Sequence, residues 1–135
     1  MKEQEYKSLP ATFSKSERLK RDKRIKELFQ KGSSFFLYPL LIKYMESPVP
    51  EGVNQILFSV SKKNFKRAVD RNLLRRRMFE AYRRHKHTLT SLPDQENFLL
   101  IAYIYVGKEK ATYQLIERQL IAALKRLNDV KSAKT

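Results

Sequence analysis

Apolar residues recur along this chain with two periods, and the two periods predict its helices and strands. From about residue 21 to Lys31 the apolar positions fall on one side of a helix, and Gly32 supplies a C-terminal stop. Towards the other end, Leu115 and the apolar residues after it recur at helical spacing, with Thr112 as a plausible N-cap. The chain therefore has a predicted helix near each end.

Other segments have the composition of strands. Residues 35–45 are rich in aromatic and aliphatic side chains and are predicted to form one strand after Pro39. Residues 55–60 place Ile56, Phe58 and Val60 on one face, and we expect them to form a hairpin with the preceding strand. Residues 98–106 are almost continuously apolar, which is typical of an interior strand covered on both faces.

A helix is also predicted from about Ala68 to Lys86, which gives the order helix–strand–strand–helix–strand–helix. This order predicts a two-layer α/β (α+β) sandwich with a small mixed sheet. A length of 135 residues with 41% hydrophobic residues fits one domain with one modest core. We expect residues 18–128 to form that domain, between a flexible N-terminal arm (1–17) and a flexible tail (129–135).

The segment from Ser61 to Arg84 carries the strongest charge signal. It holds ten basic and two acidic residues, a net charge of +8, within a chain whose net charge is +15. Like charges one helical turn apart repel each other, so a helix needed only for folding would avoid this pattern. We therefore expect an exposed cationic face that binds a polyanion, and nucleic acid is the partner that this composition favours.

The helix within this segment is predicted to be amphipathic. Its core side is expected to hold Leu74, Met78, Ala81 and His85. We interpret His85 as a hydrogen-bonded structural residue, because most such positions are structural. Phe79 lies among the basic residues of the opposite side, where it either stacks on RNA or packs under a neighbouring loop.

The sequence lacks the residues that several classes of function require. The chain has no cysteine, so it has no disulfide, no cysteine zinc site and no cysteine nucleophile. No glycine-rich phosphate loop, metal-spaced His and carboxylate set or Ser-His-Asp pattern is visible. The apolar runs are far shorter than the roughly 20 residues that cross a bilayer, and the N-terminus does not resemble a signal peptide. We expect a soluble cytoplasmic protein without a membrane partner.

The run from Val60 to Arg83 closely resembles the signature of the bacterial ribonuclease P protein subunit. Both show a Ser-Lys-Lys strand end, a short loop, then Ala-Val-x-Arg-Asn and further basic residues on a helix. The Lys-x-x-Phe-x-x-Gly pattern around Phe29 resembles the family's opening helix, and the element order matches along about residues 13–128. The resemblance implies an α/β sandwich with a left-handed βαβ crossover, whereas handedness rules alone favour a right-handed one.

A member of this family would assist a catalytic RNA in the endonucleolytic removal of the 5′ leader from precursor tRNA. The resemblance implies that the RNA subunit holds the hydrolytic Mg²⁺ ions. The protein would contribute no catalytic side chain and no organic cofactor. Its partners would be the ribonuclease P RNA and the single-stranded leader, with no obligate protein partner.

The resemblance also implies two sets of site residues. The set that contacts the RNA subunit comprises Lys62, Lys63, Lys66, Arg67, Arg71, Asn72, Arg75, Arg76, Phe79 and Arg83. The set that lines a leader-binding cleft between the opening helix and the sheet comprises Ile25, Phe29, Lys43, Ser59, Tyr103, Tyr105 and Lys108. Where the family shows Arg-Asn-Arg this chain has Leu73 in third place, and Arg77 is a candidate to replace the missing contact.

Three other functions remain open. A ribosomal or ribosome-assembly protein shares the size and charge, and would bind rRNA without affecting tRNA maturation. A protein-only nuclease would cleave RNA by itself, although the sequence shows no carboxylate cluster for a metal. A DNA-binding module would need a tandem-helix motif or a dimer seam, and neither is visible.

Overall fold

The computed structural model describes residues 18–19, 22–47, 54–86 and 98–133. The elements in these ranges follow the order α2, β1, β2, β3, α3, β4 and α4. They span Asp22–Lys31 (α2), Ser33–Leu37 (β1), Leu40–Ser47 (β2), Gln55–Val60 (β3), Ala68–His85 (α3), Phe98–Tyr105 (β4) and Tyr113–Ala133 (α4). The predicted arm (1–17) lies outside the described residues.

The sheet is mixed, with the strand order β1-β2-β4-β3. The pairs β1–β2 and β2–β4 are antiparallel, whereas β3–β4 is parallel. This architecture confirms the predicted α+β fold class and adds one strand to the predicted order. The added strand arises because the chain reverses at Tyr38–Pro39, so that Leu37 pairs with Leu40. The strand predicted after Pro39 is β2, and β1 before it was not predicted.

The predicted hairpin between β3 and the preceding strand is wrong. Strand β3 lies on the far side of β4, where Val60 pairs with Tyr105. The physical reason is that β4 is almost wholly apolar and takes the central position, so it needs a strand on each side. Helix α3 then connects two parallel strands. The hand of that crossover stays a prediction from the resemblance.

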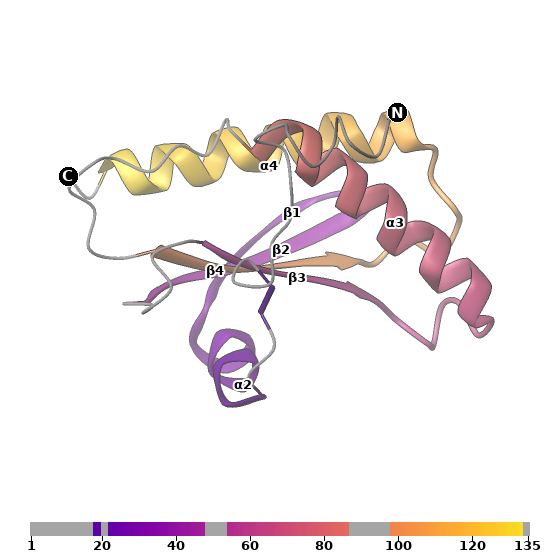
Figure 1. The fold of residues 1–135 in the computed structure, drawn as a ribbon, viewed down its shortest axis with the longest axis horizontal. Helices are drawn as coiled ribbons and strands as arrows, with labels where there is room; N and C mark the ends of the chain where they lie inside the picture. The colour runs from indigo at the N-terminus through magenta and orange to yellow at the C-terminus, as the bar shows by residue number, and fades with distance from the viewer. Residues whose placement is uncertain (1–17, 20–21, 48–53, 87–97, 134–135) are drawn as a thin grey trace, which may run out of the picture.

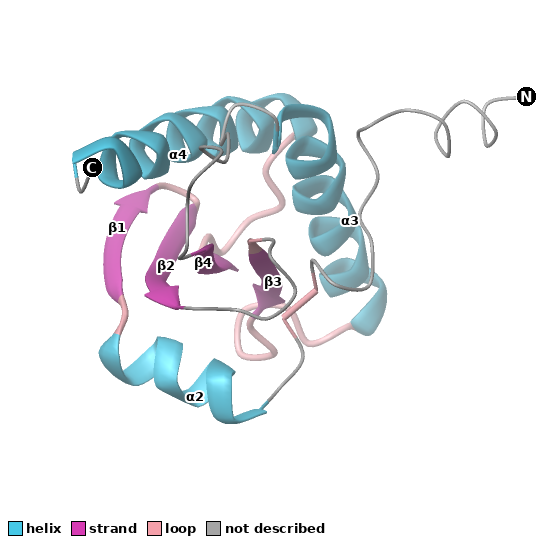
Figure 2. Cartoon of the chain, turned by 60° about the vertical axis from the view of Figure 1, so that its left-hand side comes forward, coloured by secondary structure: helices cyan, strands magenta, loops and turns pink. Residues whose placement is uncertain are grey.

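Helices cover the two faces of the sheet unequally. Helices α3 and α4 lie together on one face, and α2 lies alone on the other (Figures 1 and 2). The larger core cluster fills the α3/α4 side, and the smaller cluster around Leu28, Leu100 and Ala102 lies beneath α2. Burial of β4 on both faces confirms the predicted interior strand.

Most helix ends agree with those predicted from the sequence. Helix α3 follows its predicted bounds to within one residue. The Thr112 hydroxyl accepts a hydrogen bond from the Leu115 N–H (3.2 Å), which confirms the N-cap of α4. Helix α4 continues to Ala133, five residues beyond the predicted end of the domain, and the flexibility of residues 129–135 stays a prediction. No helix in the described ranges is long and apolar enough to cross a membrane.

Candidate nucleic-acid interface

The loop between β3 and α3 presents its lysines on an anchored backbone. Phe65 is buried, and its ring meets the edge of Tyr105 with centroids 5.8 Å apart. The Phe65 N–H donates to the Ser61 carbonyl (3.1 Å), and the Lys63 N–H donates to the Ser61 hydroxyl (3.0 Å). The neighbouring side chains of this loop, Lys62, Lys63, Lys66 and Arg67, are exposed.

Arg71 joins this loop to the helix. Its Nη1 donates to the carbonyl oxygens of Phe65 (2.9 Å) and Lys66 (2.8 Å), and the side chain is half-buried. Hydrogen bonds from a guanidinium to carbonyls are charge-assisted and therefore stronger than neutral ones. Arg71 thus holds the loop in place in addition to contributing a positive charge.

Asp70 is the one acidic residue in the N-terminal half of this basic segment. Its carboxylate lies 2.9 Å from Lys110 Nζ and 3.8 Å from Arg67 Nε. The hydrogen bond from Lys110 is the main reason why the pKa of Asp70 lies below its usual value. Lys110, which lies outside the segment, thus neutralises the Asp70 carboxylate. More of the segment's own cations are therefore left for a partner.

Eight of the ten predicted RNA contacts lie on the loop and the first half of α3. We call this set the basic surface: Lys62, Lys63, Lys66, Arg67, Arg71, Asn72, Arg75 and Arg76. Arg75 donates to the Asn72 side-chain oxygen, so these two residues orient each other. Arg71 and Arg75 are half-buried, and the other six are exposed.

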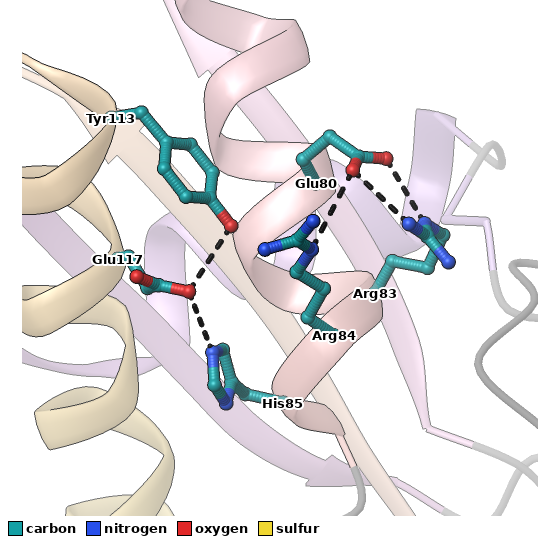
Figure 3. Close-up of polar contacts among 6 residues, drawn as sticks. All are labelled: Glu80, Arg83, Arg84, His85, Tyr113 and Glu117. Atoms are coloured by element: carbon teal, nitrogen blue, oxygen red, sulfur yellow. Dashed lines mark hydrogen bonds and ion pairs between the residues drawn. The ribbon is translucent and has the colours of Figure 1, made fainter.

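The structure does not favour the predicted RNA contact of Arg83, because this side chain is buried. Its side chain is 9% exposed, and its Nε and Nη2 donate to the two carboxylate oxygens of Glu80 at 3.0 and 3.1 Å (Figure 3). A guanidinium that leaves water needs a carboxylate partner, and Glu80 supplies it from one helical turn earlier. This pairing stabilises the helix, and the RNA contact of Arg83 stays a prediction.

Arg77 and Phe79 also have contacts within the protein. Arg77 donates to the Ala111 carbonyl, which links α3 to the segment before α4, so the structure does not favour Arg77 as a replacement RNA contact. The ring of Phe79 meets Phe58 of β3 edge to face, with centroids 6.3 Å apart. Phe79 is half-buried, which favours the packing interpretation over stacking on RNA.

The core side of α3 is largely as predicted. Leu74, Met78 and Ala81 are fully buried. His85 is only half-buried, and its Nε2 lies 2.9 Å from Glu117 Oε2 of α4, which also accepts a hydrogen bond from the Tyr113 hydroxyl (Figure 3). The bond to His85 is the main reason why the pKa of Glu117 is lowered. The structural role predicted for His85 is confirmed.

The pairing of Glu80 with Arg83 makes stability depend on pH. The hydrogen bond from Arg83 lowers the pKa of Glu80 below its usual 4.5, so the pair stabilises the fold above pH 4.5 and loses its effect as the pH falls through the lowered value. We expect Glu80→Gln to cost about 1 kcal/mol at pH 7, since 34% of the Glu80 side chain remains in water. The difference from the parent chain should shrink towards zero below pH 4 in urea titrations.

The exposed Glu109 gives a matched control for this experiment. Glu109→Gln removes the same charge without breaking the Arg83 contact. If Glu80→Gln lowered the free energy of unfolding by the same amount at pH 7 and at pH 3, the stabilising role of the Glu80–Arg83 pair would be contradicted.

The sheet face beneath α2 gathers four of the predicted leader-binding residues. Ile25 and Phe29 lie on α2, and Ile25 packs against the smaller core cluster. Lys43 of β2 donates from Nζ to the Phe29 carbonyl (3.2 Å) and lies 5.8 Å from the centre of the Phe29 ring. Ser59 of β3 is half-buried on the same face. Strand alternation therefore places Lys43 and Ser59 on the face of the sheet that α2 covers.

The structure does not favour the other two strand candidates, Tyr103 and Tyr105, as leader contacts. Both are buried in the larger cluster on the α3/α4 side. The physical reason is the two-residue period of β4, in which Ala102 and Ile104 face α2 and the tyrosines face away. Because β4 is apolar throughout, its sequence alone did not show which of its residues face α2.

The two tyrosines differ in how their hydroxyls are satisfied. The Tyr105 hydroxyl donates to the Glu109 carbonyl and accepts from the Ala111 N–H (2.8 Å), which shapes the loop that carries the exposed Lys108. The Tyr103 hydroxyl has no hydrogen-bond partner among the described residues. Burial raises the pKa of both phenols, and that of Tyr103 well above its usual value.

This difference predicts opposite effects from the same chemical change. Tyr103→Phe removes a buried hydroxyl without a partner and should leave stability unchanged or raise it by about 1 kcal/mol. Tyr105→Phe leaves the Ala111 N–H and the Glu109 carbonyl without this partner and should cost about 1–2 kcal/mol. Thermal denaturation of the two variants measures both values. Equal destabilisation by the two substitutions would contradict the assigned hydrogen bonds.

Comparison with known proteins adds independent information. The family model described as "Ribonuclease P" matches residues 13–128. The "Ribonuclease P protein component" of Porphyromonas gingivalis (strain W83) is 38% identical over 122 residues, which cover 87% of this chain and 89% of that protein. The protein of the same description from Chlorobium phaeobacteroides is 34% identical over 123 residues, which cover 81% of this chain and 83% of that protein.

Solved structures support the fold. The RNase P protein from Thermotoga maritima matches with a TM-score of 0.66 at 23% identity, over 82% of this chain and 96% of that one. The Staphylococcus aureus RNase P protein matches with a TM-score of 0.62 at 21% identity, over 82% of this chain and 94% of that one. At this identity the likeness concerns the arrangement of helices and strands alone.

Proposed function

The chain belongs to the ribonuclease P protein family, and from this premise we propose that its basic surface docks on the catalytic RNA while the sheet face beside α2 binds the 5′ leader of precursor tRNA. As a ribonuclease P protein component it is part of an endoribonuclease holoenzyme for tRNA processing, whose partner is the ribonuclease P RNA. The two assigned contacts, and the assistance they give to leader removal, are the proposal.

Electrostatics support the docking face. The basic surface brings together seven cationic side chains, Lys62, Lys63, Lys66, Arg67, Arg71, Arg75 and Arg76. If each neutralises one phosphate, the affinity for RNA should fall with salt along a log–log slope of roughly −5 to −6. Such a slope is typical of a protein held mainly by backbone phosphates, which suits a large folded RNA.

The proposed contact between the α2 side of the sheet and the leader would allow the protein to select its substrate. Only the precursor carries a leader, so binding free energy gained from that segment favours the precursor over mature tRNA. Phe29 is 37% exposed beside Lys43, and an aromatic ring next to a cation is the usual chemistry for a nucleotide that is not base-paired. This arrangement is the observation that carries the leader-binding proposal.

The proposed Mg²⁺ ions belong to the RNA. Within the described ranges, no group of three or more His, Asp or Glu side chains is arranged to hold a metal ion. We propose that the RNA subunit holds the hydrolytic ions, as the family resemblance implies. When bound, those ions would activate water and stabilise the leaving oxygen. The cations of the protein would reduce the repulsion between the two RNAs.

Reconstitution tests the proposal. The chain is mixed with a bacterial ribonuclease P RNA at low Mg²⁺, and cleavage of precursor tRNA at the mature 5′ end is measured against the RNA alone. We expect faster cleavage and tighter precursor binding, with the gain in binding dependent on the presence of a leader. No gain together with tight rRNA binding would favour the ribosomal alternative. Cleavage by the chain without RNA would favour a protein-only nuclease.

A further inference from the structure

Two aromatic rings at the β1–β2 turn are open to solvent. Phe36 is 55% exposed and Tyr38 is 54% exposed, and their rings meet edge to face with centroids 6.1 Å apart. Their neighbours Phe35 and Leu37 contact the core on the α3/α4 side, so strand alternation places Phe36 on the α2 side. Single exposed apolar residues are common, but two touching rings form a patch that suits a partner.

The backbone beneath these rings is held from two other elements. The Val106 N–H donates to the Pro39 carbonyl (2.9 Å), and Gln119 Nε2 of α4 donates to the Tyr38 carbonyl (2.8 Å). Gly107 packs closely on Pro39, since a Cβ added there would lie 2.9 Å from the proline Cβ. The turn is therefore preorganised, and a partner that binds it loses little free energy in ordering the backbone.

The exposed rings lie in line with the proposed leader site. Phe36 pairs with Leu41, Leu41 with Ile104, and Ile104 with Ser59. This row crosses the four strands on the α2 face, over three strand spacings or about 14 Å. Leu41, Ile104 and Ser59 are half-buried, so the row combines partial exposure with apolar surface. Ser59 stands at one end of the row, and Phe36 stands at the other.

Cations accompany this row. Lys43 lies two residues from Leu41 on the same face of β2, and the exposed Lys108 follows the glycine that packs on Pro39. Beyond the Ser59 end, the loop carries the exposed Lys62 and Lys63 of the basic surface. Flat rings flanked by cations suit single-stranded RNA, whose bases stack while its phosphates meet positive charge.

We propose that Phe36 and Tyr38 form a base-stacking subsite for a nucleotide of single-stranded RNA. The subsite rests on the proposed function, because its ligand is the 5′ leader. The Ser59 end of the row lies next to the basic surface and hence next to the catalytic RNA. The Phe36 end therefore takes a leader nucleotide farther from the cleavage site than those held beside Phe29 and Lys43.

Leader length tests this subsite in the reconstituted holoenzyme. The double variant Phe36→Ala/Tyr38→Ala is compared with the parent chain on precursor tRNAs whose leaders are shortened one nucleotide at a time. We expect about tenfold weaker binding of long-leader precursors. Affinity for mature tRNA, for the shortest leaders and for the RNA subunit should not change. Phe36→Tyr/Tyr38→Phe keeps both rings and should bind as the parent does.

A fluorescent base gives a second measurement on the parent chain, which does not depend on the folding of the variant. 2-Aminopurine is placed at successive leader positions, and its quenching is recorded when the holoenzyme binds. Strong quenching at one distal position, lost in the alanine variant, supports the subsite.

Several outcomes would overturn it. Unchanged long-leader affinity in the alanine variant, with the parent still selecting precursor by its leader, would reject the subsite alone. Quenching confined to positions next to the cleavage site would do the same. A change from dimer to monomer without any change in leader binding would make this patch a contact between two copies of the chain. If the parent shows no leader-dependent binding, the proposed function itself fails.

Discussion

Replacing Lys62, Lys66 and Arg67 together with alanine should weaken binding to the ribonuclease P RNA by about a hundredfold at physiological salt. These side chains are exposed on the loop before α3, and each is expected to meet one phosphate. Loss of three phosphate contacts should lower the magnitude of the log–log salt slope by about 2 to 3. Filter binding at a series of salt concentrations measures both the affinity and the slope.

A matched variant separates local contact from overall charge. Lys23, Arg118 and Lys125 are also exposed and lie on α2 and α4, so their replacement by alanine removes the same three charges elsewhere. Long-range attraction is screened over about 8 Å at physiological salt, so the affinity of this control for the RNA should fall only a few-fold. Equal losses in affinity and slope for the two triple variants would show that net charge, and not the basic surface, drives binding.

Arg71→Ala should weaken RNA binding more than Arg76→Ala does, although both remove one charge from α3. Arg71 holds the carbonyls of Phe65 and Lys66, whereas Arg76 is exposed on the helix. We expect losses of roughly thirtyfold and tenfold respectively, because the loop must be ordered again on binding when Arg71 is absent. Amide hydrogen exchange should also rise in residues 61–67 for Arg71→Ala alone.

Arg71→Lys gives a further comparison, since it keeps the charge but replaces the planar guanidinium by a single ammonium group. Its binding should fall between that of the parent and that of Arg71→Ala. Identical affinities for Arg71→Ala and Arg76→Ala, with no change in loop exchange, would remove the positioning role from Arg71. The melting temperatures of all three variants show whether the fold is intact.

The elements of this fold were largely predictable because their patterns are local. The β3 residues alternate, β4 is apolar throughout, and Thr112 precedes a long amphipathic helix. The partner of each strand was not predictable in this way. Whether β3 lies beside β2 or beside β4 depends on which strand gains most from a central position, and that is a property of the whole sheet.

The candidate site likewise has residues that could be predicted from the sequence and residues that could not. The cations of the loop and early α3 were predictable, since they crowd together in sequence and folding alone does not explain them. The burial of Arg83 was not predictable, because it depends on Glu80 and on the packing of the last turns of α3. Tyr103 and Tyr105 looked suitable by residue type, but strand alternation turns both towards the core. Phe36 and Tyr38 carried no local signal, because exposure follows from tertiary structure.

The absence of cysteine from the chain allows the docking face to be mapped directly. Single cysteines at Lys63, Arg76 and Arg118 are each coupled to an iron chelate, and hydroxyl-radical cleavage of the bound ribonuclease P RNA is recorded. We expect strong, localised cleavage of neighbouring RNA segments from positions 63 and 76, and little from position 118 on α4. Strong cleavage from position 118 with none from positions 63 and 76 would contradict docking through the basic surface.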